Sequence, residues 1–353
     1  MRWLNWISPL ARLWPFGGQE AHSPLVLDRG PVAHVIILDG TMSSLMPGCE
    51  SNAGLTYKLL SDHNSAALSL YYEAGVQWRD WRSTPDVLMG RGINRQIRRA
   101  YGYLASRYRA GDRIYLLGYS RGAYAVRSLA GMIDTVGLLK RTHATERNIV
   151  QAYRHYQCGQ GHPAADDFAR AYCHDSAPIE MVGVWDTVKA LGLRLPLLWR
   201  VSEGAHAFHS HELGPTIRHG FHALALHETR VAFEPILWEC PPGHTGRVDQ
   251  VWFRGTHGDI GGQLSGFHAA RPLANIPLVW MMEQAEECGL SLPEGWQVQF
   301  PTDPLAPSVS TWRHWGKLFL IRKARVPGQT RSERLHPTVQ AGDLNVPLAD
   351  PVA

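Results

Sequence analysis

The chain has 353 residues and a hydrophobic content of 44%, which is enough for one large domain or two modest ones with a sizeable core. Charged residues make up only 19% and the formal net charge is +4, which argues against a disordered chain and against a nucleic-acid partner. The five cysteines include no Cys-x-x-Cys pair, which favours a reducing compartment over a disulfide framework.

The first 30 residues are expected to form a segment separate from the main domain. Their apolar residues approach helical spacing, but Pro9 interrupts any single long helix. This pattern favours a short amphipathic segment packed on the body of the protein, and its Trp residues also suit peripheral contact with a membrane. Because no apolar run is long enough for a bilayer span or a signal-peptide core, we expect a cytoplasmic location in the producing cell, with membrane-peripheral association or export without a cleavable signal as alternatives.

From residue 31 onward, short apolar runs alternate with helical patterns. The runs that we predict as buried strands are 32–38, 113–117, 179–185 and 248–253. The patterns that we predict as helices are 91–109, 121–132 and 276–288. This alternation is typical of an α/β fold with a mainly parallel sheet and helices on both faces, and such sheets bind ligands at the carboxyl ends of their strands.

The predicted division of the chain has three parts, which are an N-terminal segment at 1–30, a main domain at 31–340 and a C-terminal tail at 341–353. Long stretches between the predicted elements, at about 136–178 and 190–225, are expected to hold helices that cover the site as cap insertions. Residues 325–353 are rich in Pro and polar residues and are expected to be peripheral.

The strongest motif is Gly118-Tyr119-Ser120-Arg121-Gly122, which fits the pattern G-x-S-x-G between a predicted strand and a predicted helix. In this context the glycines permit a sharp turn that exposes the serine as a nucleophile, and the helix N-terminus faces any anion formed there. The alternative is a tight turn with a capping serine.

A serine nucleophile needs a base, and the base needs an acid that orients it. Asp186 and His257 each follow a predicted strand, so both can converge on Ser120 at the carboxyl edge of the sheet. Asp259, two residues from His257, is an alternative acid that would orient the ring or simply brace the loop. Asp186 is preferred because a separate strand gives it a rigid reach to the far ring nitrogen.

The oxyanion of an acyl-transfer reaction needs two backbone donors. One is expected from Arg121, the residue after the nucleophile, and the other from the turn at Gly40 and Thr41, where glycine allows close approach. Asp39 is a further candidate at this turn, although it could serve only to bond the backbone amides there.

Several motifs, in order, resemble the α/β-hydrolase domain of type VI secretion phospholipase effectors. The motifs are at 38–41, 118–124, 183–188, 225–230, 233–235, 251–262, 276–281 and 335–339, and the resemblance extends from about residue 32 to 340. It implies lipase or phospholipase activity and a catalytic triad, carried here onto Ser120, Asp186 and His257. His336 is an alternative base because it lies in one of these motifs, although no predicted strand leads into it. Gly258 and Gln263 depart from the family loop.

Histidines are numerous within the second predicted cap stretch and just after it. Glu228 and Arg230, which also follow this stretch, are expected to form an ion pair beside the site. The histidines are His206, His209, His211, His219, His222 and His227. Because their spacing matches no tight metal-ligand pattern, we expect neither a metal nor another cofactor, and a solvated or pH-sensitive region instead.

Together these patterns predict a serine ester hydrolase that acts on an ester or phospholipid substrate through an acyl-enzyme. The alternatives are a soluble carboxylesterase on small or polymeric esters and a hydrolase-fold binding or effector protein with little catalysis.

Overall fold

The computed structural model describes residues 29–63, 65–75, 91–159, 161–188, 213–240, 243–312 and 319–344. The chain divides into two compact units, residues 1–30 and 31–353. Almost all of the first unit lies outside the described residues, so the amphipathic segment and its membrane contact stay predictions. Within the described ranges, no helix is long and apolar enough to cross a membrane.

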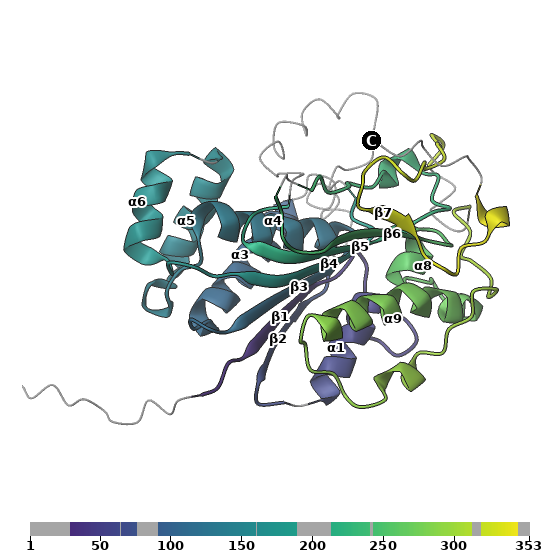
Figure 1. Ribbon diagram of the computed structural model, residues 1–353, viewed down its shortest axis with the longest axis horizontal. Helices are drawn as coiled ribbons and strands as arrows, with labels where there is room; N and C mark the ends of the chain where they lie inside the picture. Colours follow the sequence, from purple (N-terminus) through teal and green to yellow (C-terminus); the bar gives the residue numbers. More distant parts are fainter. Residues whose placement is uncertain are drawn as a thin grey trace, which may run out of the picture. The chain divides into compact units, whose positions relative to one another are not determined.

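The second unit is built around a seven-stranded sheet in the order β2-β1-β3-β4-β5-β6-β7, in which every neighbouring pair is parallel (Figure 1). The strands are β1 (Ala33–Leu38), β2 (Leu68–Glu73), β3 (Arg113–Tyr119), β4 (Ile179–Trp185), β5 (Ile217–Ala225), β6 (Val248–Phe253) and β7 (Glu333–Leu335). All six residues of β1 are buried, as expected for a parallel strand covered on both faces.

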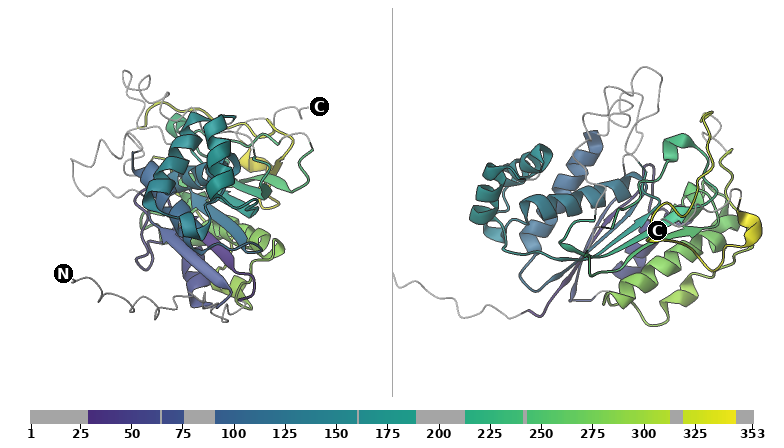
Figure 2. Two further views of the ribbon diagram at one scale, coloured as in Figure 1. Left: turned by 90° about the vertical axis from the view of Figure 1, so that its left-hand side faces the viewer. Right: turned by 45° about the horizontal axis from the view of Figure 1, so that its top comes forward.

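Helices cover both faces of this sheet (Figures 1 and 2). The α-helices are α1 (Asn52–Asp62), α3 (Arg91–Arg107), α4 (Arg121–Val136), α5 (Glu146–Cys158), α6 (Pro163–Tyr172), α8 (His257–Gly261) and α9 (Arg271–Glu287). Short 3-10 turns are η2 (Arg141–His143), η3 (Val231–Phe233), η4 (His268–Ala270), η5 (Trp296–Gln299) and η7 (Ala341–Asp343).

Two hydrophobic cores lie on opposite faces of the sheet because side chains alternate along each strand. Ile36 and Leu38 of β1 point into a core with helices α3, α4, α5 and α6. Val35 and Ile37 point into the other core, with helices α1 and α9. The α/β-hydrolase-like fold class predicted from the sequence is therefore confirmed, and each of the four predicted strands and three predicted helices is present.

The predicted cap insertions need correction. The stretch at 136–178 is helical, but α5 packs on α3 and α4, so these residues extend the helical layer of one face. In the second stretch, residues 217–225 form the buried strand β5, and residues 189–212 lie outside the described part of the chain. The sequence of β5 hid this strand because two histidines and a glycine interrupt its apolar pattern.

The C-terminal stretch predicted to be peripheral is also part of the structure. Its strand β7 pairs with β6, and Arg325 is buried. The interpretation as peripheral was therefore wrong, because composition alone does not reveal a short edge strand that needs only three residues.

Two glycines of the G-x-S-x-G motif allow helix α4 to approach the end of β1. An added Cβ at Gly122 would lie 2.1 Å from the Leu38 carbonyl oxygen and 2.5 Å from that of Asp39. An added Cβ at Gly118 would lie 2.7 Å from the Gly122 carbonyl oxygen. Because all these atoms belong to backbone, no side-chain rotation relieves the clash, and the turn is compatible only with glycine.

We predict that Gly122→Ala destabilises the fold by about 2 kcal/mol or more, since strand β1 and helix α4 must separate. Thermal unfolding measures this as a fall in Tm of roughly 5 °C or more. Gly342→Ala is the control, because no heavy atom lies within 4 Å of its added Cβ. Equal melting temperatures for Gly122→Ala and wild type would contradict the close approach.

Candidate active site

Ser120 lies in the turn between β3 and α4, at the carboxyl edge of the sheet. Its backbone has φ 56° and ψ −119°, a conformation that non-glycine residues rarely adopt. The turn is anchored by the Ser120 amide, which donates to the Trp185 carbonyl oxygen at 3.0 Å. The structure thus holds the serine on a strained turn, as the motif predicts.

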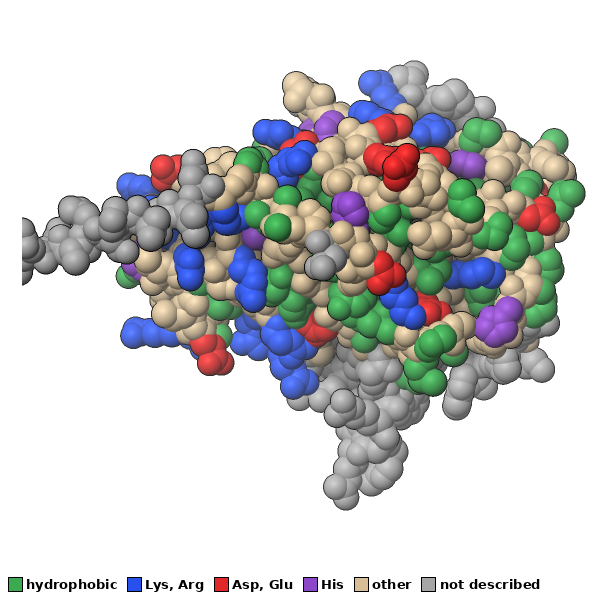
Figure 3. All heavy atoms as spheres, turned by 90° about the horizontal axis from the view of Figure 1, so that it is seen from below, with side chains coloured by type: hydrophobic (Ala, Val, Ile, Leu, Met, Phe, Trp, Pro, Cys, Tyr) green, Lys and Arg blue, Asp and Glu red, His purple; other side chains and the backbone are tan. Residues whose placement is uncertain are grey.

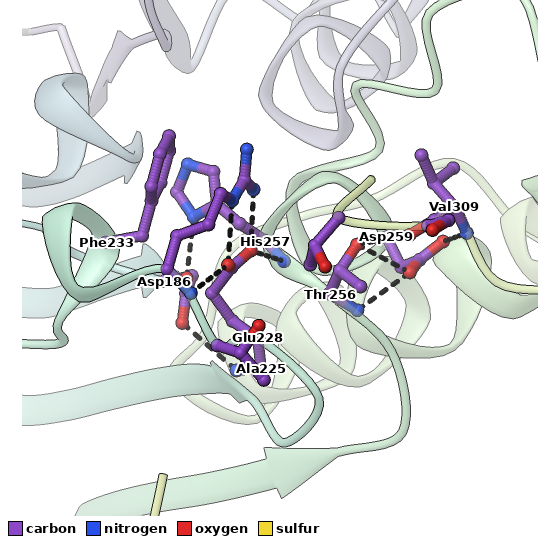
Figure 4. Close-up of polar contacts among 12 residues, drawn as sticks. Asp186, Ala225, Glu228, Phe233, Thr256, His257, Asp259 and Val309 are labelled. Atoms are coloured by element: carbon purple, nitrogen blue, oxygen red, sulfur yellow. Dashed lines mark hydrogen bonds and ion pairs between the residues drawn. The ribbon is translucent and has the colours of Figure 1, made fainter. Parts of the chain in front are cut away.

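His257 is the first residue of the short helix α8, and three residues separate it from the end of strand β6 at Phe253 (Figure 4). Its Nε2 lies 2.9 Å from the Ser120 Oγ, and its Nδ1 lies 2.6 Å from the Asp186 Oδ2. The rings of Tyr119 and Phe233 pack against the imidazole, with centroids 5.0 and 4.8 Å away. Three residues from separate strand ends are therefore joined in one hydrogen-bonded chain.

Asp186 follows β4 with φ 42° and is fully buried. Its Oδ1 accepts hydrogen bonds from the Ala225 amide at 3.0 Å and from the Arg325 Nη1 at 2.6 Å. Its Oδ2 accepts from the Arg325 Nη2 at 3.1 Å as well as facing His257. Burial alone raises the pKa of Asp186, but the Arg325 charge and the His257 hydrogen bond outweigh it and hold the pKa well below its usual value.

The alternative acid, Asp259, faces a different set of partners (Figure 4). It accepts hydrogen bonds from the Thr256 amide at 2.7 Å, the Ser308 hydroxyl at 2.5 Å and the Val309 amide at 2.9 Å. These contacts brace the start of α8 and connect it to residues 308–309. It is Asp186, and not Asp259, that the structure places on the His257 ring.

The alternative base, His336, is placed just after β7. Its Nδ1 bonds to the Thr338 hydroxyl at 2.8 Å, and its ring stacks on Phe253 at 4.5 Å. Burial and the nearby Arg334 lower the pKa of His336 to about 4. The structure thus gives His336 local partners, while His257 is the histidine joined to Ser120.

The predicted donors at the Gly40 turn need one correction. Gly40 does lie against the nucleophile, because a Cβ built on it would be 3.5 Å from the Ser120 Cβ. However, the Gly40 amide donates to the Asp39 Oδ1 at 2.6 Å, so this amide is already engaged. Asp39 is buried, which raises its pKa, and it also accepts from the Ser51 hydroxyl at 2.6 Å. Asp39 therefore fixes the turn. Of the two predicted residues, it is Gly40 whose amide is bound by this carboxylate, and no carboxylate of the described residues is bound to the Thr41 amide.

Glu228 and Arg230 form the ion pair that the sequence suggested. The Arg230 Nε and Nη2 lie 2.8 and 2.6 Å from the two carboxylate oxygens of Glu228. Burial raises the pKa of Glu228, but the Arg230 pairing outweighs it and lowers the pKa overall. The His257 amide donates to the Glu228 Oε2 at 3.2 Å, so the pair supports the backbone at the start of α8 (Figure 4).

Arg325 is the site residue that the sequence reasoning missed. It lies in a stretch of Pro and polar residues, and no motif or periodic pattern marks it. Only the fold shows that this segment returns to the back of Asp186, where the guanidinium is buried.

The histidine cluster divides in two. His206, His209 and His211 lie outside the described residues. The other three bond to protein groups, which are the Arg247 amide for His219, the Thr187 amide for His222 and the Asp343 carbonyl for His227. Within the described part of the chain, no group of three or more His, Cys, Asp or Glu side chains could hold a metal ion.

Comparison with known proteins gives the family. The catalytic-domain family described as "T6SS, Phospholipase effector Tle1-like" matches residues 33–284, more than half of the chain. Uncharacterized protein YEL023C of Saccharomyces cerevisiae is 24% identical over 252 residues, covering 64% of this chain and 35% of the yeast protein. The chain thus spans about a third of the length of this relative.

Three solved structures are also similar to the chain. An uncharacterized protein from Pseudomonas aeruginosa is 15% identical with a TM-score of 0.42, covering 77% of this chain and 49% of the other. The Tle1 effector bound to the VgrG spike is 17% identical with a TM-score of 0.31, covering 66% and 51%. An esterase from Thermogutta terrifontis is 13% identical with a TM-score of 0.38, covering 76% and 87%.

The parallel sheet and the turn at Ser120 define an α/β-hydrolase-like protein. The chain belongs to the family of Tle1-like phospholipase effector catalytic domains of type VI secretion, as the motifs predicted.

The buried His222 generates a prediction on acid stability. The His222 Nε2 accepts a hydrogen bond at 3.1 Å from the amide of Thr187, the residue that follows Asp186. Burial lowers the pKa of His222 to about 3. The unfolded chain therefore binds a proton that the folded chain excludes between about pH 6.5 and 3. Stability contributed by neutral His222 is complete above about pH 6.5 and is lost as the pH falls through this window.

We expect the Tm of wild type to fall more steeply between pH 7 and 4.5 than that of His222→Gln, by roughly 5 °C over this range. The difference between the two proteins removes the contribution of other titrating groups such as His336. Parallel curves for the two proteins would show that His222 is not responsible.

Proposed function

We propose that this protein hydrolyses the carboxylic esters of phospholipids through an acyl-enzyme on Ser120. The observation that carries the proposal is the chain of hydrogen bonds from the Ser120 Oγ through both nitrogens of His257 to Asp186. A serine, an imidazole and a buried carboxylate in this order are the parts that nucleophilic ester hydrolysis requires.

In the proposed mechanism, the His257 Nε2 takes the proton of Ser120 as the Oγ attacks the ester carbonyl carbon. Asp186 accepts the Nδ1–H bond, which holds the ring in the required tautomer and stabilises the imidazolium. The tetrahedral intermediate then collapses, and the leaving alcohol takes the proton from Nε2. A water molecule, deprotonated by the same nitrogen, attacks the acyl-enzyme and releases the carboxylic acid and free Ser120.

The developing oxyanion is assigned to the amides of Arg121 and Thr41. Arg121 directly follows Ser120 and begins helix α4, so its amide is one of the backbone donors at the N-terminus of this helix. Thr41 follows the glycine that lies against Ser120, and its buried hydroxyl has no hydrogen-bond partner among the described residues. These two amides are assigned because one residue directly follows Ser120 and the other directly follows the glycine against it, where fixed backbone donors can stabilise a developing negative charge.

A lipid substrate is supported by the family and by exposed apolar side chains near the site. Met42, next to Thr41, is 53% exposed. On another side, Phe319 packs its ring 5.4 Å from Phe233, which contacts His257, and the next residues, Leu320 and Ile321, are 80% and 66% exposed. Apolar groups in water beside a hydrolytic site favour a substrate with acyl chains over a small polar ester.

The surface seen in Figure 3, which is the lower face in the view of Figure 1, carries basic, acidic and hydrophobic side chains interspersed among its described residues. Export without a cleavable signal, suggested by the family's link to type VI secretion, remains part of the proposal.

The direct test is hydrolysis of phosphatidylglycerol and phosphatidylethanolamine vesicles, with products identified by mass spectrometry. We expect wild type to release fatty acid and lysophospholipid, and Ser120→Ala to lose at least about 10³-fold of this rate. The same proteins are assayed on p-nitrophenyl butyrate. Turnover of the soluble ester without any lipid product would instead favour the soluble carboxylesterase, and lipid release by Ser120→Ala would overturn the mechanism.

The two aspartates near His257 are expected to behave differently. Asp186→Asn should lower kcat by about 10³-fold or more, because the amide can no longer accept the Nδ1 hydrogen bond in the required tautomer. Asp259→Asn should lower the Tm, because its four hydrogen bonds from Thr256, Ser308 and Val309 weaken, with a much smaller loss of kcat. The reverse ranking of the two kcat values would reassign the acid to Asp259.

A further inference from the structure

We infer that Arg325 is the positioning residue of the catalytic acid: its guanidinium fixes both the orientation and the charge of the Asp186 carboxylate. The inference rests on the proposed function of Ser120, His257 and Asp186. Arg325 lies beyond residues 33–284, which match the family model, and outside every motif that carries the family resemblance. Its position is therefore a feature of this structure and not of the matched motifs.

The hydrogen bonds of the Asp186 carboxylate fix its orientation. An ionised carboxylate offers about four acceptor positions on its two oxygens. On Asp186, Oδ1 accepts from Arg325 and Ala225, and Oδ2 accepts from Arg325 and His257. All four positions are filled, and two of them are filled by one planar guanidinium, so the carboxylate plane has a single orientation that aims Oδ2 at the His257 Nδ1.

The Arg325 guanidinium is itself held in place by backbone carbonyl groups. Its Nη1 donates to the Ala225 carbonyl oxygen at 2.9 Å, and its Nη2 donates to the Phe233 carbonyl oxygen. Ala225 is the last residue of strand β5. Phe233 belongs to the turn η3, and the Phe233 ring packs on His257. The guanidinium therefore bridges two fixed backbone positions and Asp186, and only 6% of its side chain is exposed.

Arg325 also compensates the negative charge of the buried Asp186. A buried carboxylate is costly unless a cation compensates it. Arg325 supplies a permanent positive charge, so Asp186 stays ionised without taking a proton from solvent or requiring His257 to be protonated. Without this charge, the buried Asp186 would be neutralised most readily by protonation of the adjacent His257, and a protonated His257 cannot act as the base.

Other charged and titratable groups around this pair are compensated or directed elsewhere. Glu228, which accepts the His257 amide, is paired with Arg230, and Asp259 faces Thr256, Ser308 and Val309. Among the described residues, Tyr119 and His222 also interact electrostatically with Asp186, and His222 interacts with Arg325. Arg325 is the cation that contacts Asp186 directly, so its removal is expected to dominate any change.

The test is the pH dependence of p-nitrophenyl butyrate hydrolysis by two variants of the full chain. Arg325→Gln removes the positive charge and the paired hydrogen bonds of the guanidinium to Asp186. We therefore expect kcat/KM near neutral pH to fall about 100-fold, and the pH below which kcat/KM declines (the acid limb of the profile) to rise by about one pH unit. Arg325→Lys keeps the positive charge but loses the paired hydrogen bonds of the planar guanidinium. We therefore expect kcat to fall about tenfold, while the acid limb of the pH profile stays within about 0.3 pH unit of that of wild type. KM should change little in both variants, because the Arg325 guanidinium is buried against Asp186.

The matched control is Arg322→Gln, three residues earlier in the same segment. Arg322 bonds to Thr229 and Thr311 rather than to Asp186, so this variant should keep the wild-type profile. Circular dichroism and Tm establish that each variant is folded. If Arg325→Gln does not fold, Arg325→Lys decides the question through kcat.

A folded Arg325→Gln variant whose pH profile coincides with wild type would overturn the inference, and so would Arg325→Lys with wild-type kcat. These results differ from failure of the proposed function. If Ser120→Ala still hydrolysed the ester, the mechanism would fail whatever the Arg325 variants did. If Ser120→Ala were inactive and the Arg325 variants were unchanged, only the role of Arg325 would fail.

Discussion

The candidate site depends on the burial of one carboxylate. Asp186 is fully buried, and a buried charge is stable only when its acceptor positions are filled and a cation lies close by. These requirements connect the end of β4 to the end of β5 through the Ala225 amide, to α8 through His257, and to the segment before β7 through Arg325. Four parts of the chain are thus held together by the group that orients the imidazole.

A second constraint is the close approach of backbones at the carboxyl edge of the sheet. Helix α4 approaches β1 so closely at Gly122 that no side chain fits, and this approach places the strained Ser120 next to the Gly40 turn. Asp39 fixes the Gly40 turn, because its carboxylate accepts hydrogen bonds from the Gly40 amide and the Ser51 hydroxyl. The nucleophile and the candidate oxyanion donors are therefore positioned by glycine and hydrogen bonds, before any substrate binds.

Much of this arrangement could be predicted from the sequence because it follows strand ends. Ser120 and Asp186 come directly after apolar strands and His257 lies four residues past the end of another, and parallel strands bring such positions to one edge. Family membership and the fold class followed from the same segments and are confirmed. The catalytic roles of these residues remain a proposal that the geometry supports.

What the sequence did not reveal has physical reasons. Strand β5 carries His219, Gly220 and His222 inside a buried strand, and the neutral His222 is accommodated only because Thr187 and Gln250 bond to it. The engaged amide of Gly40 depends on the side-chain rotamer of Asp39. Arg325 acts through a contact 139 residues distant in sequence, and a single arginine in a polar stretch gives no periodic signal of such a contact.

The central claim is that Ser120 is an activated nucleophile, and intact mass after treatment with a fluorophosphonate probe tests it most directly. The account predicts a single phosphonyl adduct on the wild-type protein and none on a folded Ser120→Ala variant treated side by side. An unmodified wild-type protein that is folded, or an equal adduct on Ser120→Ala, would contradict it.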